Sequence, residues 1–285
     1  MLKPMLLTDG RQPFDDPAWL WEVKWDGIRC VAVKSAGAAR LYSRHQREMT
    51  AQFPETVRAL AGLPAGIYDG ELVCLAGDGR ADFYQVMERH GLQDGRRISR
   101  AAMTAPATFM AFDLIEHAGR RVTGLPLTDR KELLSALTWT GDGAQLVETF
   151  PGTAGSALFS AVGARDVEGI VGKRCSSIYR LDHRSTDWLK VKAWRTQEVT
   201  ILGVRWEPEF GALVGAPGGA PLCVVELGWT PADRSALARL VPELAPRRHG
   251  DMTWVNPVLR ARIRYRVTPT GKLREPVWDG FLLAA

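Results

Sequence analysis

The sequence has no long apolar run. No apolar stretch in its 285 residues approaches the roughly 20 residues that a membrane-spanning helix needs. The opening residues, MLKPMLLTDGRQPF, lack the long apolar core and the small-residue cleavage site of a signal peptide. Internal repeats and low-complexity tracts are also missing. We therefore expect a cytoplasmic protein with no membrane partner.

Cysteine is scarce, and charge is only weakly biased. The four cysteines lie far apart and form no CxxC pair: Cys30, Cys74, Cys175 and Cys223. A disulfide framework or a zinc site is therefore not expected, and a reducing compartment fits best. The net charge of +5, with a pI near 9.2, favours nucleic acid as a partner only mildly.

The chain is long enough for two domains. Residues 66–76 (GIYDGELVCLA) and 107–117 (ATFMAFDLIEH) read as core strands because they are rich in branched and aromatic side chains. Residues 50–60 read as a helix opened by a threonine, and a second helix is expected from Thr128, which suits an N-cap. This mixture predicts an antiparallel α+β domain over residues 1–194.

The second domain, predicted over residues 195–285, has a different pattern. Short strand-like runs such as EVTILGVRW, LCVVELGW and ARIRYRVT alternate with Gly- and Pro-rich turns such as GAPGGAP. One helical patch, PADRSALARL, interrupts them. Several short strands in a segment of this length are typical of a small β-barrel, for which the OB-fold is the leading candidate.

A cation stands at an unexpected place in the stretch WEVKWDGIRC. Lys24 lies between Val23 and Trp25, at the end of an apolar run that only Glu22 interrupts. The Asp-Gly pair that follows is a turn signal, which would put Lys24 at the mouth of a pocket. Taken alone, a surface lysine before a hairpin turn is the simpler interpretation.

Charged residues recur in the same way along the chain. They occupy the ends of otherwise apolar segments, in the order SR at 43–44, DGE at 69–71, FD at 112–113, EGIVGK at 168–173 and WLKVK at 188–192. Each has a structural explanation when taken singly, such as an exposed basic edge for Lys190 and Lys192. Burying so many charges is costly unless they pair or bind a charged ligand. The set as a whole therefore indicates a ligand site.

With KxDGxR at residues 24–29, this ordered set resembles the nucleotidyltransferase motifs of ATP-dependent DNA ligases. The similarity extends over nearly the whole chain and is strongest for the bacterial end-joining type, the ligase domain of ligase D and its stand-alone relatives. The resemblance implies a nucleotidyltransferase domain with ATP-grasp-like antiparallel sheets, followed by an OB-fold domain. It also implies ATP and Mg²⁺ or Mn²⁺ as cofactors. The expected protein is a nucleoid-associated monomer that acts on nicked or broken double-stranded DNA, with end-joining or repair proteins as partners.

In this family a lysine attacks the α-phosphate of ATP. The AMP then passes to the 5′-phosphate of a nick, and the 3′-hydroxyl displaces it. Lys24 matches the nucleophile. Because only a neutral amine can attack, we expect its pKa to be lowered by partial burial and by nearby cations such as Lys190 and Lys192. These two lysines are also expected to stabilise the α-phosphate as negative charge develops on it.

The resemblance implies roles for the other motif residues. At the nucleoside, these are Glu22 near the adenine amino group, Phe112 stacked on the base, Arg29 and Glu71 on the ribose, and Lys173 in the nucleotide pocket. At the phosphates and the metal, they are Arg44 on the AMP phosphate and then on the nick 5′-phosphate, Glu168 on the divalent metal, and Asp26 as a support of the site with a metal contact left open.

The second domain adds an arginine pattern of its own. In VLRARIRYRV, Arg260, Arg262, Arg264 and Arg266 alternate with apolar residues, so a strand would present all four on one face. An edge strand guarded by charge is the alternative, but repulsion between like charges favours a surface that faces phosphates. We assign Arg274 to the same DNA-binding set.

The sequence departs from the family pattern at two places. Relatives end with extra basic residues that orient the pyrophosphate of ATP, whereas GKLREPVWDGFLLAA keeps Lys272 and Arg274 but has Asp279 where a cation is common. Slow self-adenylation is the expected consequence. Gln46 stands where a glycine is common after the SR pair.

Two other functions remain open from the sequence. One is a related lysyl-nucleotide enzyme, an RNA ligase or an mRNA-capping guanylyltransferase, which the WLKVK spacing disfavours. The other is a non-catalytic DNA-end-binding protein that kept the fold but lost turnover. The intact lysines of the motifs and Glu168 disfavour that reading.

Overall fold

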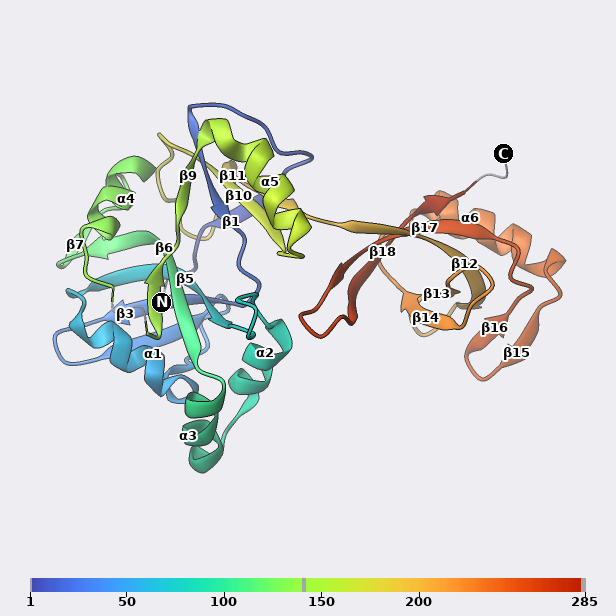
Figure 1. Cartoon of the computed structure of the whole chain (residues 1–285), viewed down its shortest axis with the longest axis horizontal. Helices are drawn as coiled ribbons and strands as arrows, with labels where there is room; N and C mark the ends of the chain where they lie inside the picture. The colour runs from blue at the N-terminus through green and yellow to red at the C-terminus, as the bar shows by residue number, and fades with distance from the viewer. Residues whose placement is uncertain (1, 140–141, 283–285) are drawn as a thin grey trace. The chain divides into compact units, whose positions relative to one another are not determined.

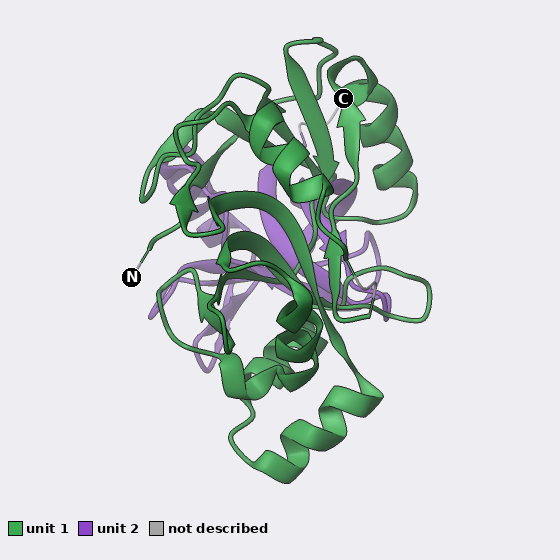
Figure 2. Ribbon diagram, turned by 90° about the vertical axis from the view of Figure 1, so that its left-hand side faces the viewer, with its two compact units in different colours: residues 1–193 green, residues 194–285 purple. Residues whose placement is uncertain are grey.

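The chain folds into two compact units, Met1–Ala193 and Trp194–Ala285, which Figure 2 shows in separate colours. The computed structural model describes residues 2–139 and 142–282. The division lies one residue before the predicted boundary. Each unit has its own sheets and its own hydrophobic core. None of the helices in the described ranges is long and apolar enough to cross a membrane.

Two sheets form unit 1 (Figure 1). The first has the strand order β1 (Leu6–Asp9), β11 (Arg184–Lys192), β10 (Gly169–Arg174), β2 (Trp19–Val23) and β9 (Thr149–Pro151). The second has the order β4 (Ala39–Ser43), β3 (Ile28–Lys34), β5 (Gly66–Cys74), β6 (Ala107–His117) and β7 (Arg120–Arg121), with β8 (Ala144–Leu146) paired to β6. Only β1–β11 and β6–β8 are parallel among the described pairs. The two predicted core strands are confirmed as β5 and β6.

Helices cover these sheets, and two of them differ from the sequence prediction. Residues 50–60 do not form one helix, because Pro54 lacks the N–H that a helix interior needs. Helix α1 (Pro54–Ala59) is instead flanked by 3₁₀ turns at Thr50–Gln52 and Leu60–Gly62. Helix α4 (Leu127–Ser135) begins before Thr128, so the predicted cap is wrong. The Thr128 hydroxyl donates to the side chain of Asp129 instead.

Two further helices, α2 (Phe83–Gly91) and α3 (Gly95–Thr104), were not predicted from the sequence. Each begins after an aspartate whose carboxylate accepts a hydrogen bond from a backbone N–H of the first turn, Asp82 from Gln85 and Asp94 from Arg97. This is ordinary N-capping, and the two aspartates could have predicted the start of each helix from the sequence.

One apolar face of each sheet of unit 1 lies against helices, and the opposite faces carry the residues of the site together with smaller apolar clusters. Trp21, Ile170 and Val191 of the first sheet pack with α5 (Gly155–Ala164). Since neighbouring strand residues point to opposite faces, Glu22 on β2 and Lys190 on β11 point away from this core. The second sheet packs residues such as Tyr68, Leu72 and Phe109 into the largest core. Its alternate residues, among them Arg29 and Glu71, are free to line a site.

Unit 2 is a strongly curved antiparallel sheet with one main helix. Its strands follow the order β14 (Pro221–Val225), β13 (Gly211–Gly215), β12 (Arg195–Arg205), β16 (Met252–Trp254) and β15 (Arg247–His249), and β12 also pairs β17 (Arg260–Val267), which pairs β18 (Leu273–Phe281). A bridge between Leu227 and Val277 brings the edge near β14 to β18, as a barrel requires. Helix α6 (Pro231–Leu240) starts with a capping box between Thr230 and Asp233.

Candidate active site

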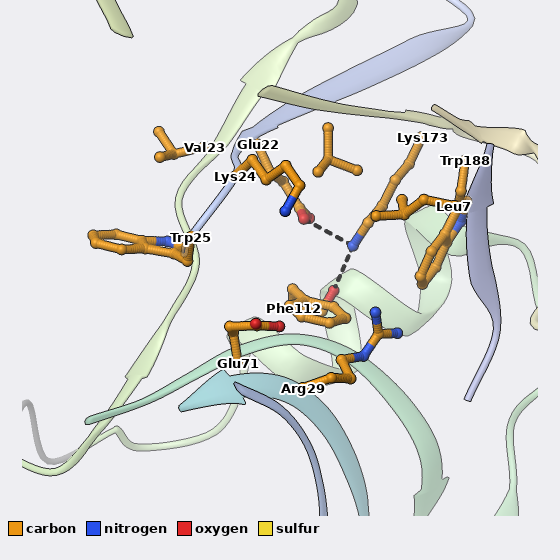
Figure 3. Close-up of a pocket in the computed structure, with 11 residues that line it drawn as sticks. Leu7, Glu22, Val23, Lys24, Trp25, Arg29, Glu71, Phe112, Lys173 and Trp188 are labelled. Carbon is orange, nitrogen blue, oxygen red and sulfur yellow. Dashed lines mark hydrogen bonds and ion pairs between the residues drawn. The ribbon is translucent and has the colours of Figure 1, made fainter. Parts of the chain in front are cut away.

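One pocket of unit 1 collects residues from both sheets (Figure 3). It is lined by Leu7, Glu22, Val23, Lys24, Trp25, Arg29, Glu71, Phe112, Val171, Lys173 and Trp188. Including space open to solvent, it measures about 390 Å³. Six residues predicted to act on a nucleotide therefore line the same pocket: Glu22, Lys24, Arg29, Glu71, Phe112 and Lys173.

Lys24 follows directly after β2 and is held by backbone contacts. Its N–H donates to the carbonyl of Gly169, with the two atoms 2.9 Å apart. Gly169 has a φ of +147°, and a Cβ there would lie 2.1 Å from the carbonyl oxygen of Val191. A Cβ on Gly27 would similarly lie 2.0 Å from the carbonyl oxygen of Leu72. Both motif glycines are thus required by the close approach of neighbouring strands.

The Lys24 ammonium lies among carboxylates. Its Nζ is 2.6 Å from Oε2 of Glu168, and the lysine side chain is 18% exposed. Burial lowers the pKa of Lys24, but the charges of Glu168, Glu71 and Asp26 outweigh it, so the pKa is raised above its ordinary value.

The predicted lowering of the Lys24 pKa is therefore wrong for the protein alone. The two expected cations are themselves paired with acids: Lys192 lies 3.9 Å from the other oxygen of Glu168, and Lys190 lies 3.2 Å from Asp9. Glu168 thus stands between Lys24 and Lys192, and its negative charge dominates. Sequence spacing predicted that these groups would be near one another but not which pairs would form.

The ribose-binding candidates differ in how firmly they are held. Arg29 donates two hydrogen bonds to Asp69, at 2.7 and 2.6 Å, and Asp69 also accepts from the Tyr179 hydroxyl at 2.6 Å. Glu71 lies across from Arg29 on the neighbouring strand. Burial raises the pKa of Glu71 to about 7, although Lys24 and Arg29 oppose the shift. Glu71 thus changes charge near neutral pH.

Two cations lie near the Phe112 ring. The Arg29 guanidinium lies 4.5 Å and the Lys173 ammonium 4.4 Å from the ring centroid. Lys173 also forms an ion pair of 2.8 Å with Glu22 and donates to the Phe112 carbonyl at 3.3 Å (Figure 3). Burial lowers the pKa of Lys173 to about 8, although Glu22 opposes the shift. Phe112 and Glu22 therefore lie close together, as a base-binding end of the pocket requires.

A divalent metal would have few protein ligands here. The described residues contain no group of three or more His, Cys, Asp or Glu side chains arranged to hold a metal ion. Mg²⁺ is commonly held by one or two carboxylates together with substrate phosphates and water. Glu168, which is 7% exposed and beside Lys24, fits such a role, and the charge of Asp26 acts on the same lysine. The residues present fit a metal shared with a nucleotide.

Arg44 lies apart from these pocket residues, on an exposed turn after β4. The turn is closed by backbone bonds from Ser43 to Arg47 and from Gln46 to Ser43. Gln46 has a φ of +64°, a conformation that favours glycine. This explains why a glycine suits the position that Gln46 occupies.

The arginine pattern of unit 2 is paired with acids. Arg260 forms an ion pair with Glu198, and Asp279 accepts from Arg262 at 2.6 Å and lies 3.0 Å from Arg264. Asp279, which stands where relatives often have a cation, thus neutralises Arg262 and Arg264.

Arg266 departs from the predicted exposed face. It is 6% exposed and lies 3.4 Å from Glu275, which is also 3.7 Å from Arg274. Its strand pairs with β18, and Arg266 lies across from Arg274 in that pair. Of the four predicted arginines, only Arg260, Arg262 and Arg264 retain substantial exposure.

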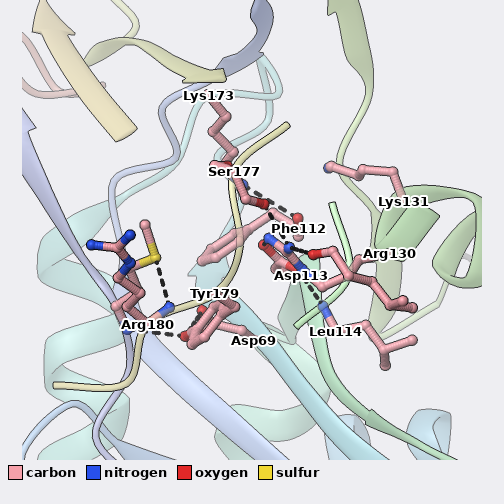
Figure 4. A network of polar contacts seen from close by, with 12 residues as sticks. Asp69, Phe112, Asp113, Leu114, Arg130, Lys131, Lys173, Ser177, Tyr179 and Arg180 are labelled. Carbon is pink, nitrogen blue, oxygen red and sulfur yellow. Dashed lines mark hydrogen bonds and ion pairs between the residues drawn. The ribbon is translucent and has the colours of Figure 1, made fainter. Parts of the chain in front are cut away.

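A buried network behind Phe112 was missed from the sequence (Figure 4). Arg130 on α4 donates to both carboxylate oxygens of Asp113, at 2.7 and 2.8 Å, and both side chains are fully buried. Arg130 also donates to the carbonyl of Ser177 at 2.9 Å. Asp113 in an apolar strand signalled a buried partner. No spacing rule identifies Arg130 as that partner.

A second missed residue is the neighbour of Arg130. Lys131 forms an ion pair with Oε1 of Glu22, and its side chain is 12% exposed. Glu22 therefore has a lysine on each carboxylate oxygen, since Lys173 pairs with Oε2. Lys131 lies in no recognisable motif, and only the packing of α4 brings it to the site.

Comparisons with known proteins agree with this geometry. Residues 7–192 match the family model described as the ATP dependent DNA ligase domain. The chain is 30% identical to the SPbeta prophage-derived DNA ligase-like protein LigB of Bacillus subtilis, and the match covers 98% of each protein. It is 34% identical to the multifunctional non-homologous end joining DNA repair protein LigD of Mycobacterium tuberculosis, with 98% of this chain covered. The match spans only 38% of that relative.

A solved structure carries the same fold. The structure described as mycobacterial DNA ligase D complexed with ATP and MES matches with a TM-score of 0.61 at 31% identity, over 100% of this chain and 96% of that one. The predicted mixed α+β ligase fold is thereby confirmed. The family model covers well over half of the residues, and the motif side chains line one pocket. The chain belongs to the ATP-dependent DNA ligase family.

Proposed function

We propose that this ligase seals nicks between a 5′-phosphate and a 3′-hydroxyl through AMP carried on Lys24. The observation that supports this is the position of Lys24, which lines a pocket together with Glu22, Phe112 and Lys173. Attack of its Nζ on the α-phosphate of ATP forms the N–P bond and breaks the bond to pyrophosphate. The AMP then passes to the 5′-phosphate at the nick. The 3′-hydroxyl displaces AMP in the last step and closes the strand.

The nucleoside is held by residues from both sheets. Phe112 offers a ring for stacking on the base, and Glu22 offers a carboxylate acceptor for the adenine amino group. Arg29 and Glu71 are assigned to the ribose. Arg29 is oriented for that task by Asp69, which fixes its guanidinium with two hydrogen bonds.

The phosphates require positive charge and a deprotonated nucleophile. Lys24 must lose a proton before it attacks, and Glu168, 2.6 Å away, is placed to accept it. Lys192 and Lys190 on β11 are assigned to the α-phosphate, and Arg44 to the AMP phosphate and the nick 5′-phosphate. A divalent cation held by Glu168, with Asp26 nearby, would neutralise phosphate charge and weaken the hold of Glu168 on Lys24.

The proposed substrate is nicked or broken double-stranded DNA in end joining. The LigD relative is named for non-homologous end joining, and the match to it extends through both units. In unit 2, the exposed arginines Arg260, Arg262 and Arg264 form the proposed contact to DNA phosphates. Arg274 and the buried Arg266 are proposed to support this surface through Glu275.

The deciding experiment measures the covalent intermediate. The protein is incubated with ATP and Mg²⁺ or Mn²⁺, and intact mass is recorded. One added AMP is expected in the wild type and none in Lys24→Ala, whereas the exposed Lys3→Ala in the same unit should be labelled normally. Absence of an adduct in the wild type, with none preformed, would overturn the proposal. Sealing of nicked DNA compared with nicked RNA separates a DNA ligase from an RNA ligase.

A further inference from the structure

A chain of three buried charges lies at the base-binding end of the pocket. Glu22 is 2% exposed, and it lies between Lys173, whose Nζ is 2.8 Å from Oε2, and Lys131, which pairs with Oε1. Glu22 and Lys173 line the pocket, whereas Lys131 reaches Glu22 from α4 without lining it. We propose that Lys131 is a positioning residue that fixes Glu22 for recognition of the purine 6-amino group. This inference rests on the proposed function and names a determinant of its nucleotide specificity.

Pairing Glu22 with Lys173 alone would already balance the buried charge. The second lysine makes the cluster net positive, which is an added desolvation cost that packing alone does not explain. Desolvation is also the main reason that the Lys173 pKa lies well below its ordinary value, and the charge of Lys131 adds to that shift. A costly buried charge next to a ligand pocket is more readily explained by a functional role.

The geometry of the pair leaves the carboxylate able to bind a ligand. Lys131 forms an ion pair with Oε1, whereas Lys173 lies 2.8 Å from Oε2. A carboxylate has about four lone-pair positions on its two oxygens. Two lysines therefore hold both oxygens electrostatically and prevent the group from turning, while acceptor capacity remains.

Lys131 is itself held in place by the buried network next to it. Its neighbour Arg130 is locked between Asp113 and the carbonyl of Ser177. Asp113 in turn follows Phe112, so one rigid connection places both the stacking ring and the lysine that orients Glu22 (Figure 4). The residue that stacks on the base, Phe112, and the residue that orients Glu22, Lys131, are thus linked through the Asp113–Arg130 pair.

This arrangement would distinguish adenine from guanine. The 6-amino group of adenine donates hydrogen bonds, which a fixed carboxylate accepts. Guanine places a carbonyl oxygen at the same position, and its lone pairs would oppose those of the carboxylate. When Lys131 is removed, Glu22 is free to turn onto Lys173, and the acceptor for the amino group is no longer held in position.

The test compares ATP with purine riboside triphosphate, which lacks the 6-amino group. For Lys131→Met, the KM for ATP in self-adenylation should rise about tenfold, the typical loss for a hydrogen bond to a charged group. The rate at saturating ATP should change little, and the KM for the purine analogue should stay the same. Lys131→Arg should restore the preference for ATP. Glu132→Gln, an exposed change on the same helix, is the matched control.

Binding constants measured by calorimetry make the test independent of turnover. If wild-type protein forms no adduct but binds ATP more tightly than the analogue, and Lys131→Met removes the difference, the proposed function fails and this inference stands. Equal losses for ATP and the analogue would show a merely structural role and overturn the inference. An unchanged preference for ATP in Lys131→Met would also overturn it. Lys131→Gln, which keeps a donor, replaces the methionine variant if that protein does not fold.

Discussion

The two units of this ligase use charge in opposite ways. Unit 1 buries charged side chains, namely Glu22, Lys34, Asp69, Arg89, Asp113, Arg130, Glu168 and Lys173. In the described part of unit 2, Arg266 is the only charged side chain that is buried. Ion pairs such as Arg260–Glu198 lie at the surface. The core of unit 2 is apolar and includes the stacked rings of Trp229 and Trp278, whose centroids lie 3.8 Å apart.

This difference fits the roles proposed for the two units. A nucleotide pocket needs charges held at fixed positions away from water, where electrostatic interactions are strong, and each such charge must then have a buried partner. A surface that contacts DNA phosphates needs accessible arginines, which water can screen when the DNA is absent. The comparison therefore predicts large effects for substitutions in unit 1 and small ones for charge pairs in unit 2.

The largest effect is expected from Lys24→Met. Removing the nucleophile should reduce nick sealing on the order of 10³-fold or more, because no other side chain replaces it. DNA binding through unit 2 should stay unchanged, as measured by electrophoretic mobility shift on a nicked duplex. Residual sealing above a few per cent would show that another residue carries the AMP.

The next largest effect is expected on stability, from the buried Arg130–Asp113 pair of unit 1. Arg130→Met leaves Asp113 buried without its partner, which should lower the free energy of unfolding by about 3–5 kcal/mol. The matched change in unit 2, Glu198→Gln, breaks a pair whose side chains are 60% and 54% exposed. It should cost at most about 1 kcal/mol. Urea unfolding of both variants measures the contrast, and equal losses would contradict it.

A smaller effect on stability is expected when the pH is changed. Burial raises the pKa of Glu71 to about 7 from 4.5. Glu71 therefore stabilises the folded state while it is protonated, and this contribution is lost as the pH rises through 7. Between pH 6 and pH 8 the wild type should lose about 1 kcal/mol more stability than Glu71→Gln. Parallel pH profiles for the two proteins would exclude this role.

The smallest effect is expected in unit 2. Asp279→Asn should release Arg262 and Arg264 and tighten nicked-DNA binding a few-fold, since each added phosphate contact steepens the salt dependence by roughly 0.9 in the log–log slope. The double variant Arg262→Gln, Arg264→Gln should flatten that slope. Binding measured over a series of salt concentrations gives both slopes. If neither variant changes the slope, these arginines do not contact phosphates.

Several features followed from local sequence. Strands β5 and β6 were predicted because runs of branched and aromatic residues favour extended structure. Thr230 and Asp233 mark the start of α6 by a capping box. The helices α2 and α3 were missed although Asp82 and Asp94 cap them and their few apolar residues recur with helical periodicity.

The motifs identify the charged residues of the pocket without the structure. Lys24 lies three residues before Gly27 and Glu168 directly before Gly169, and both glycines are needed where strands approach closely. Tertiary structure decided how the charges pair. Lys24 lies on Glu168 rather than beside Lys190, and Glu22 is shared by Lys131 and Lys173. These partners are far apart in the chain, so sheet register and helix packing select them, and no spacing pattern records that choice.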